Sequence, residues 1–183
     1  YTRGAFRNGT TELVVPRGMA DNNWSAIPEI AIFDTATDTF VTSFGVPAAD
    51  GNVHGIEDIA ITPNGKYAYA SYFTWGGSLS SFEIFVIDLD TREIIDFLTL
   101  NTGDTSTHGV AMRPDGLLVG VSSWNTGRVS WIFTPTNTVV QEDEVGANPN
   151  EIAFSPDGTK AYVTNQNSQN VSVIRLPSTH QLL

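Results

Sequence analysis

Short runs of β-branched and aromatic residues recur along the whole 183-residue chain, each bounded by Gly, Pro, Asn or Asp. Examples are Ile59-Ala60-Ile61, Tyr69-Ala70-Ser71 and Ile84-Phe85-Val86-Ile87. Runs of this length and composition predict β-strands, and no stretch shows the 3.6-residue periodicity of an amphipathic helix. The pattern therefore predicts an all-β protein built from short strands.

One turn is repeated between these runs. It reads Thr62-Pro63-Asn64-Gly65, Arg113-Pro114-Asp115-Gly116 and Ser155-Pro156-Asp157-Gly158, with a weaker version at Phe6-Arg7-Asn8-Gly9. Proline in second position and glycine in fourth suit a type I turn. Four aspartates recur at turns, where a carboxylate accepts hydrogen bonds from the local backbone, so we assign a structural role to Asp34, Asp88, Asp115 and Asp157.

The turn anchors a larger repeated unit. Each unit reads strand a, Pro-Asp-Gly turn, strand b, loop, strand c, second turn and strand d, and the copies cover residues 1–46, 56–100, 108–145 and 150–183. A four-stranded unit of this kind cannot bury both of its faces alone, whereas stacking units around an axis buries both. We therefore predict a single β-propeller domain, residues 1–183, with about four antiparallel, four-stranded blades.

The last unit carries a family resemblance. Tyr162-Val163-Thr164-Asn165, preceded by Ser155-Pro156-Asp157-Gly158 and followed by Val171-Ser172-Val173-Ile174, closely resembles the YVTN-type β-propeller repeat. The second and third units are recognisable and the first is degenerate, so the resemblance covers nearly the whole chain. It implies kinship with archaeal surface-layer proteins and exported bacterial proteins. It is specific for the fold and says little about function, since one fold hosts many functions.

The number of units is smaller than the resemblance implies. Complete propellers of that family resemble seven-bladed rings, and this chain holds about four blades and stops within its last strand d. We expect the chain to be part of a larger ring. The alternatives are that four blades close by themselves, or that two chains associate to complete one ring. An open arc would leave bare blade faces and unpaired strands.

Charge and composition exclude several partners. With 9 basic and 20 acidic residues the net charge is −11, which disfavours nucleic acid and anionic lipid as partners. The chain has no cysteine, so disulfides and thiolate sites are excluded. No apolar run approaches the roughly 18 residues of a membrane span, so we predict no membrane insertion. Charged residues make up only 16%, and this composition together with the resemblance predicts an extracellular, cell-surface or periplasmic location.

The long b–c and d–a loops are expected on one face of the propeller, and loops on a rigid scaffold usually carry function. Three b–c loops each hold a tryptophan, Trp24, Trp75 and Trp124, while Gln166 takes that place in the fourth. Exposed tryptophans could stack on a sugar or anchor a protein partner. The alternative is that each ring folds back between blades. Trp131, within a strand c, is expected in the core.

A second group of candidates precedes or begins each strand a, near the predicted central channel. Alignment on the turns places Glu57, His108 and Asn150 in one column, with Asp58 beside it and His54 three residues before Glu57. Histidine with carboxylates can bind a metal, but no spacing here is diagnostic. We predict a ligand- or partner-binding cluster, with no metal and no cofactor.

No nucleophile elbow, phosphate-binding loop or His-Glu-x-x-His motif is present, which favours a non-catalytic protein. The leading hypothesis is an extracytoplasmic propeller that binds a protein or glycan through its long-loop face. One alternative is a propeller enzyme, of lactonase type or associated with redox enzymes, that uses the histidine and carboxylate cluster. Another is a structural building block of a surface layer or filament.

Overall fold

The computed structural model describes residues 3–17, 28–46, 55–73, 84–100 and 106–178. Within these residues every regular element is a β-strand, and the strands form four separate antiparallel sheets. None of the described residues lies in a helix long and apolar enough to cross a bilayer. The all-β prediction is confirmed.

The first two sheets have four strands each, joined in sequence order. Blade 1 consists of β1 (Ala5–Phe6), β2 (Glu12–Arg17), β3 (Glu29–Asp34) and β4 (Thr39–Gly45). Blade 2 consists of β5 (Gly55–Ile61), β6 (Tyr67–Phe73), β7 (Ile84–Asp88) and β8 (Glu93–Leu98).

The other two sheets follow the same order of strands. Blade 3 consists of β9 (Thr107–Met112), β10 (Leu118–Ser123), β11 (Arg128–Phe133) and β12 (Thr138–Glu144). Blade 4 has three strands in the described part of the chain, β13 (Pro149–Phe154), β14 (Lys160–Asn165) and β15 (Asn170–Arg175). The fourth strand predicted at residues 181–183 lies outside the described residues.

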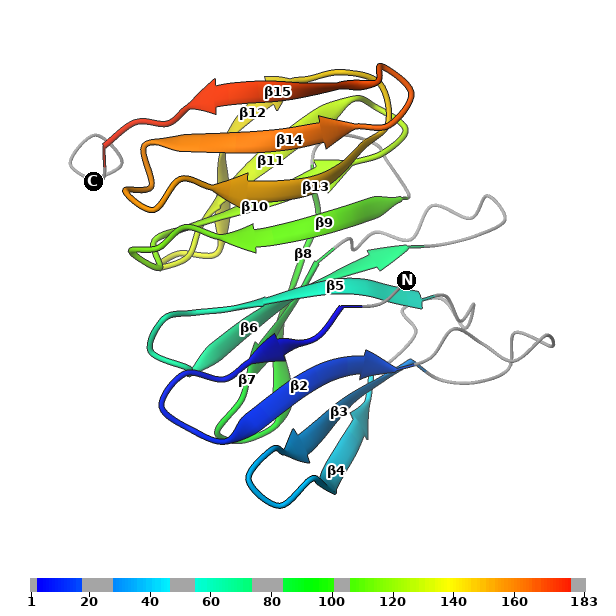
Figure 1. The fold of residues 1–183 in the computed structure, drawn as a ribbon, viewed down its shortest axis with the longest axis vertical. Helices are drawn as coiled ribbons and strands as arrows, with labels where there is room; N and C mark the ends of the chain where they lie inside the picture. Colours follow the sequence, from blue (N-terminus) through cyan, green and yellow to red (C-terminus); the bar gives the residue numbers. More distant parts are fainter. Residues whose placement is uncertain (1–2, 18–27, 47–54, 74–83, 101–105, 179–183) are drawn as a thin grey trace, which may run out of the picture.

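The four sheets stack side by side as blades (Figure 1). The first strand of each blade is innermost, and β5, β9 and β13 contact one another in turn. Each pair of adjacent blades encloses its own hydrophobic cluster. This arrangement is a β-propeller, as the repeat predicts.

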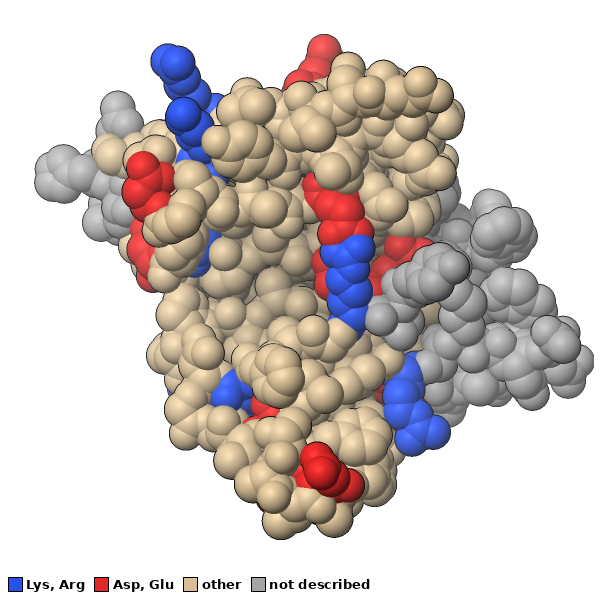
Figure 2. All heavy atoms as spheres, in the orientation of Figure 1, with Lys and Arg blue, Asp and Glu red and all other residues tan. Residues whose placement is uncertain are grey.

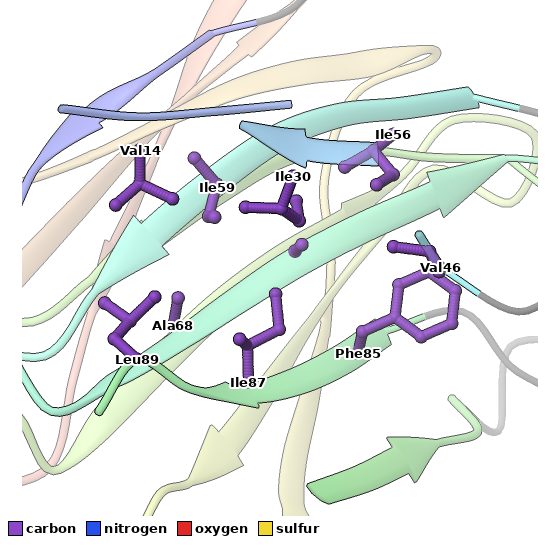
Figure 3. Packing of buried hydrophobic residues seen from close by; sticks show 10 residues of the cluster. Val14, Ile30, Val46, Ile56, Ile59, Ala68, Phe85, Ile87 and Leu89 are labelled. Carbon is purple, nitrogen blue, oxygen red and sulfur yellow. The ribbon is translucent and has the colours of Figure 1, made fainter. Parts of the chain in front are cut away.

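The cluster between blades 1 and 2 shows how such an interface is built (Figure 3). Val14 and Ile30 of blade 1 pack against Ile59, Ala70 and Phe85 of blade 2, and all five are buried. Alternate residues of a strand point to opposite faces, so a central blade needs apolar residues on both. Between blades 3 and 4 the cluster includes Trp131, only 1% exposed, which confirms its predicted core position.

Three of the four predicted turns form as expected. The amide of Gly65 donates to the carbonyl of Thr62, and Gly116 and Gly158 repeat this bond with Arg113 and Ser155. The turn of blade 1 differs: it closes between the carbonyl of Arg7 and the amide of Thr10, one residue later than Phe6–Gly9. Gly9 therefore takes the third turn position with φ of 77°, where a positive φ suits a type II geometry.

The four turn aspartates behave as predicted. Oδ1 of each accepts a hydrogen bond from an amide two residues along the chain, at Ala36, Asp90, Leu117 and Thr159. The hydroxyl of Ser155 also donates to Asp157, and these bonds lower the pKa of the Asp157 carboxyl to about 2. They stabilise the turns through local contacts, without any ligand.

Candidate functional site

Each fully described inner strand carries a bulge at the same place. The pairing skips between Ile56 and Ile59 on β5 and between Pro149 and Ile152 on β13, and a matching skip occurs between β9 and β10. A bulge sets two residues of one strand against one residue of its partner and re-aims their side chains. The predicted column of candidate residues falls on these bulges: residues 57–58, 108–109 and 150–151.

A hydroxyl residue of the second strand fills each bulge. In blade 2 the amide of Asp58 donates to Oγ of Ser71, whose hydroxyl donates to the carbonyl of His108 in blade 3. In blade 3 the amide of Gly109 donates to Oγ of Ser122, whose hydroxyl donates to the carbonyl of Asn150 in blade 4. These relays satisfy buried backbone groups and fix the spacing between successive inner strands.

His108 and Glu57 form the centre of the site. Nδ1 of His108 lies 2.5 Å from Oε2 of Glu57, and their side chains are 19% and 20% exposed. A carboxylate at this distance accepts a hydrogen bond from Nδ1, and in the neutral form of the ring this tautomer leaves Nε2 as an acceptor. Two adjacent blades thus hold one polar pair across their interface.

Ser106 and Trp124 complete the surroundings of the imidazole. Oγ of Ser106 lies 3.0 Å from Nε2 of His108. The ring of Trp124 lies against the imidazole at a centroid distance of 4.6 Å and an interplanar angle of 31°. Because one nitrogen faces Glu57 and the other faces Ser106, the histidine is held in one orientation.

Asp58 is directed between the blades. Its Oδ2 accepts a hydrogen bond from the amide of Val110 in blade 3, and its Oδ1 accepts one from Ile59. Burial raises the pKa of this carboxyl, against the opposing effect of these two hydrogen bonds and of the Arg3 charge. The side chain is accordingly a bridge between blades, held by two amide donors.

A small polar cavity of about 20 Å³ opens beside the pair. Arg3 and Glu151, which form an ion pair, border it together with Glu57, Asp58, His108 and Asn150. This volume accommodates one or two water molecules and no larger ligand. On the face of the molecule that Figure 2 shows, basic and acidic side chains lie next to each other near the middle.

A larger, open groove is bordered by Trp124. It has a volume of about 420 Å³, and it is formed by the loop after β10 and the connection from β12 to β13. Its lining is Trp124, Asn125, Thr126, Gly127, Glu144, Val145, Gly146, Ala147 and Asn148. Trp124 therefore contacts His108, which lines the polar cavity, and also borders a groove wide enough for a peptide side chain or a sugar ring.

The structure brings part of the predicted site together. Glu57, Asp58 and His108 meet at one blade interface. Asn150 lines the same small cavity, and its carbonyl accepts a hydrogen bond from Ser122. Trp124 is half-buried, and its ring lies against His108 of the same blade. Trp24, Trp75 and His54 lie outside the described residues.

Two participants were missed by the sequence analysis. Ser106 and Arg3 precede the inner strands, and neither belongs to a recognisable motif. Ser71, Ser122 and Thr164 did carry a signal in the sequence, because a hydroxyl residue recurs at the same position of the second strand in blades 2, 3 and 4. Among the described residues no group of three or more His, Asp or Glu side chains could hold a metal ion.

Comparisons with known proteins agree on the fold. No family model matches the chain. The periodic tryptophan protein 2 homolog of Schizosaccharomyces pombe is 26% identical over 111 residues, which is 61% of this chain and 12% of that protein. The solved structure of hydrazine synthase from Kuenenia stuttgartiensis superposes with a TM-score of 0.74 at 19% identity, covering 91% of this chain and 56% of that one.

The chain thus spans about half of the solved neighbour and a small part of the curated relative. Identities this low show the fold and leave membership of the YVTN-type family a prediction. Both comparisons and the four antiparallel sheets support a β-propeller, and a histidine and carboxylate pair joins its second and third blades.

Proposed function

We propose that this chain is a non-catalytic interaction propeller, extracytoplasmic in location, whose long-loop face binds a protein or glycan partner beside Trp124. The observation that carries the proposal is the position of Trp124. Its ring lies against His108, and the residue also borders the open groove. A tryptophan held by a rigid neighbour loses little freedom on binding, which favours its use as an anchor.

Two further observations support an interaction role. The periodic tryptophan protein 2 homolog, a WD-repeat protein, supports a propeller that serves as an interaction scaffold. The groove lining includes the polar residues Asn125, Thr126 and Asn148, which suit hydrogen bonding to an extended peptide or a sugar. The extracytoplasmic location is supported by the repeat resemblance and by the polar, charge-poor composition.

A displayed peptide library and a glycan array, both probed with the purified chain, test this proposal. Ligands selected by the wild-type chain should bind a Trp124→Ala variant at least about tenfold more weakly, as expected for loss of an aromatic anchor. An Ile95→Ser variant is the matched control, because Ile95 is 49% exposed on β8, away from the groove. Unchanged binding by a folded Trp124→Ala variant would exclude the groove as the binding site.

The contacts of His108 favour a second candidate function, hydrolysis of a carboxylic ester. Glu57, His108 and Ser106 are in the order required of an acid, a base and a nucleophile. The Ser106 oxygen would add to the ester carbonyl carbon while its proton moves to Nε2 of His108. That proton would leave with the alcohol, and water would then release the acid and restore Ser106.

A fluorophosphonate probe and a p-nitrophenyl ester separate this candidate from the first. Covalent labelling at Ser106, abolished in Ser106→Ala and His108→Ala variants, would establish the hydrolase. No labelling and no turnover above the uncatalysed rate would exclude it and leave the interaction role standing. Peptide or glycan binding is measured on the same preparations, so the two candidates are decided independently.

A further inference from the structure

An arginine joins neighbouring blades at two of the three junctions within the chain. Arg7 and Arg113 begin the turns between the first and second strands of blades 1 and 3. Arg7 donates through Nε to the carbonyl of Gly65 at 2.7 Å and through Nη1 to that of Leu89 at 3.3 Å, both in blade 2. Arg113 donates through Nη1 to the carbonyl of Pro177 in blade 4 at 3.2 Å. Their side chains are 14% and 3% exposed, so each one fills its junction.

The junction between blades 2 and 3 has a threonine at this position. The amides of Arg7, Thr62 and Arg113 each donate to the carbonyl of the first residue of the second strand, which makes the three positions equivalent. The side chain of Thr62 stays within its own turn, where Oγ1 donates to Oδ1 of Asn64 at 2.6 Å. It is too short to cross to blade 3 as the two arginines cross to their neighbours.

An open groove of about 340 Å³ lies beside Thr62, at the place that the arginine fills in the other two junctions. Its lining includes Thr62 and Tyr67 of blade 2 and Gly116, Thr134 and Pro135 of blade 3. The blades are equally close here, since a Cβ atom added to Gly116 would lie 2.8 Å from Cδ of Pro63. At the first junction a Cβ atom added to Gly65 would lie 2.6 Å from the carbonyl oxygen of Asn8. The groove therefore results from the short side chain of Thr62.

The backbone acceptors of the other two junctions recur in this groove. Thr134 and Pro135 directly follow β11, as Leu89 follows β7 and Leu176 and Pro177 follow β15. Each carbonyl that accepts from Arg7 or Arg113 has a counterpart in the groove: Gly116 for Gly65, Thr134 for Leu89 and Pro135 for Pro177. A planar guanidinium, with several N–H donors in fixed directions, suits such a set of converging carbonyls.

Tyr67 takes the place of the carboxylate that accompanies Arg7. Glu12, which pairs with Arg7 at 2.8 Å, begins β2 as Tyr67 begins β6. The face of an aromatic ring attracts a cation and stacks well on a guanidinium. Nζ of Lys66 already lies 4.8 Å from the centroid of this ring, which shows that the ring receives a cation. The net charge of −11 adds a general attraction for a basic ligand.

We propose that the groove between blades 2 and 3 binds the guanidinium group of an arginine from a partner protein. The guanidinium donates to the carbonyls of Gly116, Thr134 and Pro135, and its plane lies against Tyr67. The β5–β6 and β9–β10 turns, which border the groove, lie at the opposite end of the blades from the β10–β11 loop that carries Trp124 (Figure 1). The inference is therefore independent of the proposed function.

Titration of the ¹⁵N-labelled chain with N-acetyl-arginine amide, followed by NMR, tests the proposal. We expect saturable shifts of the Gly116 and Thr134 amides with a dissociation constant of about 1 mM, as for a few charge-assisted hydrogen bonds. N-acetyl-lysine amide should bind at least about fivefold more weakly, because a compact ammonium cannot reach the separate carbonyls together. No saturable shift, or equal affinity for the two amides, would overturn the proposal.

Thr62→Arg supplies the side chain from within blade 2. It should occupy the groove, as Arg7 and Arg113 occupy their junctions, and should weaken binding of N-acetyl-arginine amide at least about tenfold. Ser155→Arg is the matched control, because it adds the same charge at the equivalent position of blade 4, away from the groove. It should bind as the wild type does. Unchanged binding by a folded Thr62→Arg variant would show that the ligand lies elsewhere.

A second variant adds no charge to the turn. Tyr67→Leu keeps an apolar side chain at the junction and removes the aromatic face, so it should weaken binding of N-acetyl-arginine amide about fivefold. The affinity for N-acetyl-lysine amide should fall less, because an ammonium does not stack on the ring. Equal losses for the two amides, or no loss for either, would contradict a guanidinium held against Tyr67.

Discussion

Strands β10 and β14 occupy the same position in consecutive blades and differ in what covers them. All six residues of β10 are buried, whereas exposed and buried residues alternate along β14. Both strands have two neighbours in their own sheets, so the difference arises entirely from the blades outside the sheet. Blade 3 lies between two blades, while only one face of blade 4 is covered within the chain (Figure 1).

This comparison shows that the repeat specifies which residue types lie on each face of a blade. Whether those residues are buried depends on whether another blade covers that face. Tyr69 and Tyr162 stand at equivalent pairs, opposite Val86 and Val173, and their exposed fractions are 1% and 40%. A tyrosine in the interior needs a partner for its hydroxyl, and Asn137 supplies it for Tyr69. Burial beside Asp96 also raises the pKa of the Tyr69 phenol.

The largest expected difference in the free energy of unfolding is between variants that remove the ring of Tyr69 and variants that remove the ring of Tyr162. Tyr69→Ala should lower the free energy of unfolding by about 3–5 kcal/mol, because it leaves a cavity between blades 2 and 3. Tyr162→Ala should cost less than about 1 kcal/mol, because this ring is 40% exposed. Urea unfolding followed by tryptophan fluorescence measures both, and equal losses would show that blade 4 is covered as completely as blade 2.

A smaller difference is expected at the hydroxyl relays. Ser122→Ala leaves the amide of Gly109 and the carbonyl of Asn150 without their shared buried partner, which should cost about 1–3 kcal/mol. Thr164→Ala, at the equivalent but exposed position, should cost less than half as much, because water replaces the hydroxyl. The same unfolding measurement applies, and a larger loss for Thr164→Ala than for Ser122→Ala would contradict the relay.

The smallest expected effect is a difference in pKa between the carboxyl of Asp58, which lies between blades, and that of Asp157, which lies at a turn. Asp58 should titrate above its ordinary value of 3.8 because burial disfavours its charge, whereas Asp157 should titrate near 2 because its hydrogen bonds favour the charge. Carboxyl NMR shifts measured against pH give both midpoints. Equal midpoints would place both carboxyls in the same kind of environment.

As the pH rises, the pKa shift of Asp58 lowers the free energy of unfolding and that of Asp157 raises it. The raised pKa of Asp58 contributes stability that is complete below pH 3.8 and is lost as the pH rises through its folded value. The lowered pKa of Asp157 contributes stability that is complete above 3.8 and is lost as the pH falls through about 2. Asp58→Asn should therefore flatten the pH dependence of the unfolding free energy above pH 3.8, and a profile unchanged from wild type would argue against a buried carboxyl.

Much of the fold follows from local features of the sequence. Proline and glycine at fixed turn positions, and period-two runs such as Tyr162–Asn165, specify strands and turns without reference to the rest of the chain. The first turn was placed one residue too early, because Arg7-Asn8-Gly9 lacks the proline that fixes the register elsewhere. Local chemistry predicts a turn there but leaves its exact register open.

The candidate site was only partly predictable. Aligning the repeats brought Glu57, Asp58 and His108 into one neighbourhood, because equivalent positions of inner strands meet near the axis. Ser106 and Arg3 carry no repeat signal, and their contacts depend on how neighbouring blades are rotated. The sequence left open whether Trp124 is exposed or folded back between blades, and its stacking on His108 depends on the fold of the adjacent inner strand.

By itself, the sequence determined the strands, the turns, the repeated blade and the residue types on each blade face. These features depend on short-range rules of backbone geometry and side-chain alternation. The tertiary structure decided which faces are covered, which hydroxyls join successive blades and which side chains meet at His108. These outcomes depend on contacts between residues far apart in the chain, so they arise only once the blades are stacked.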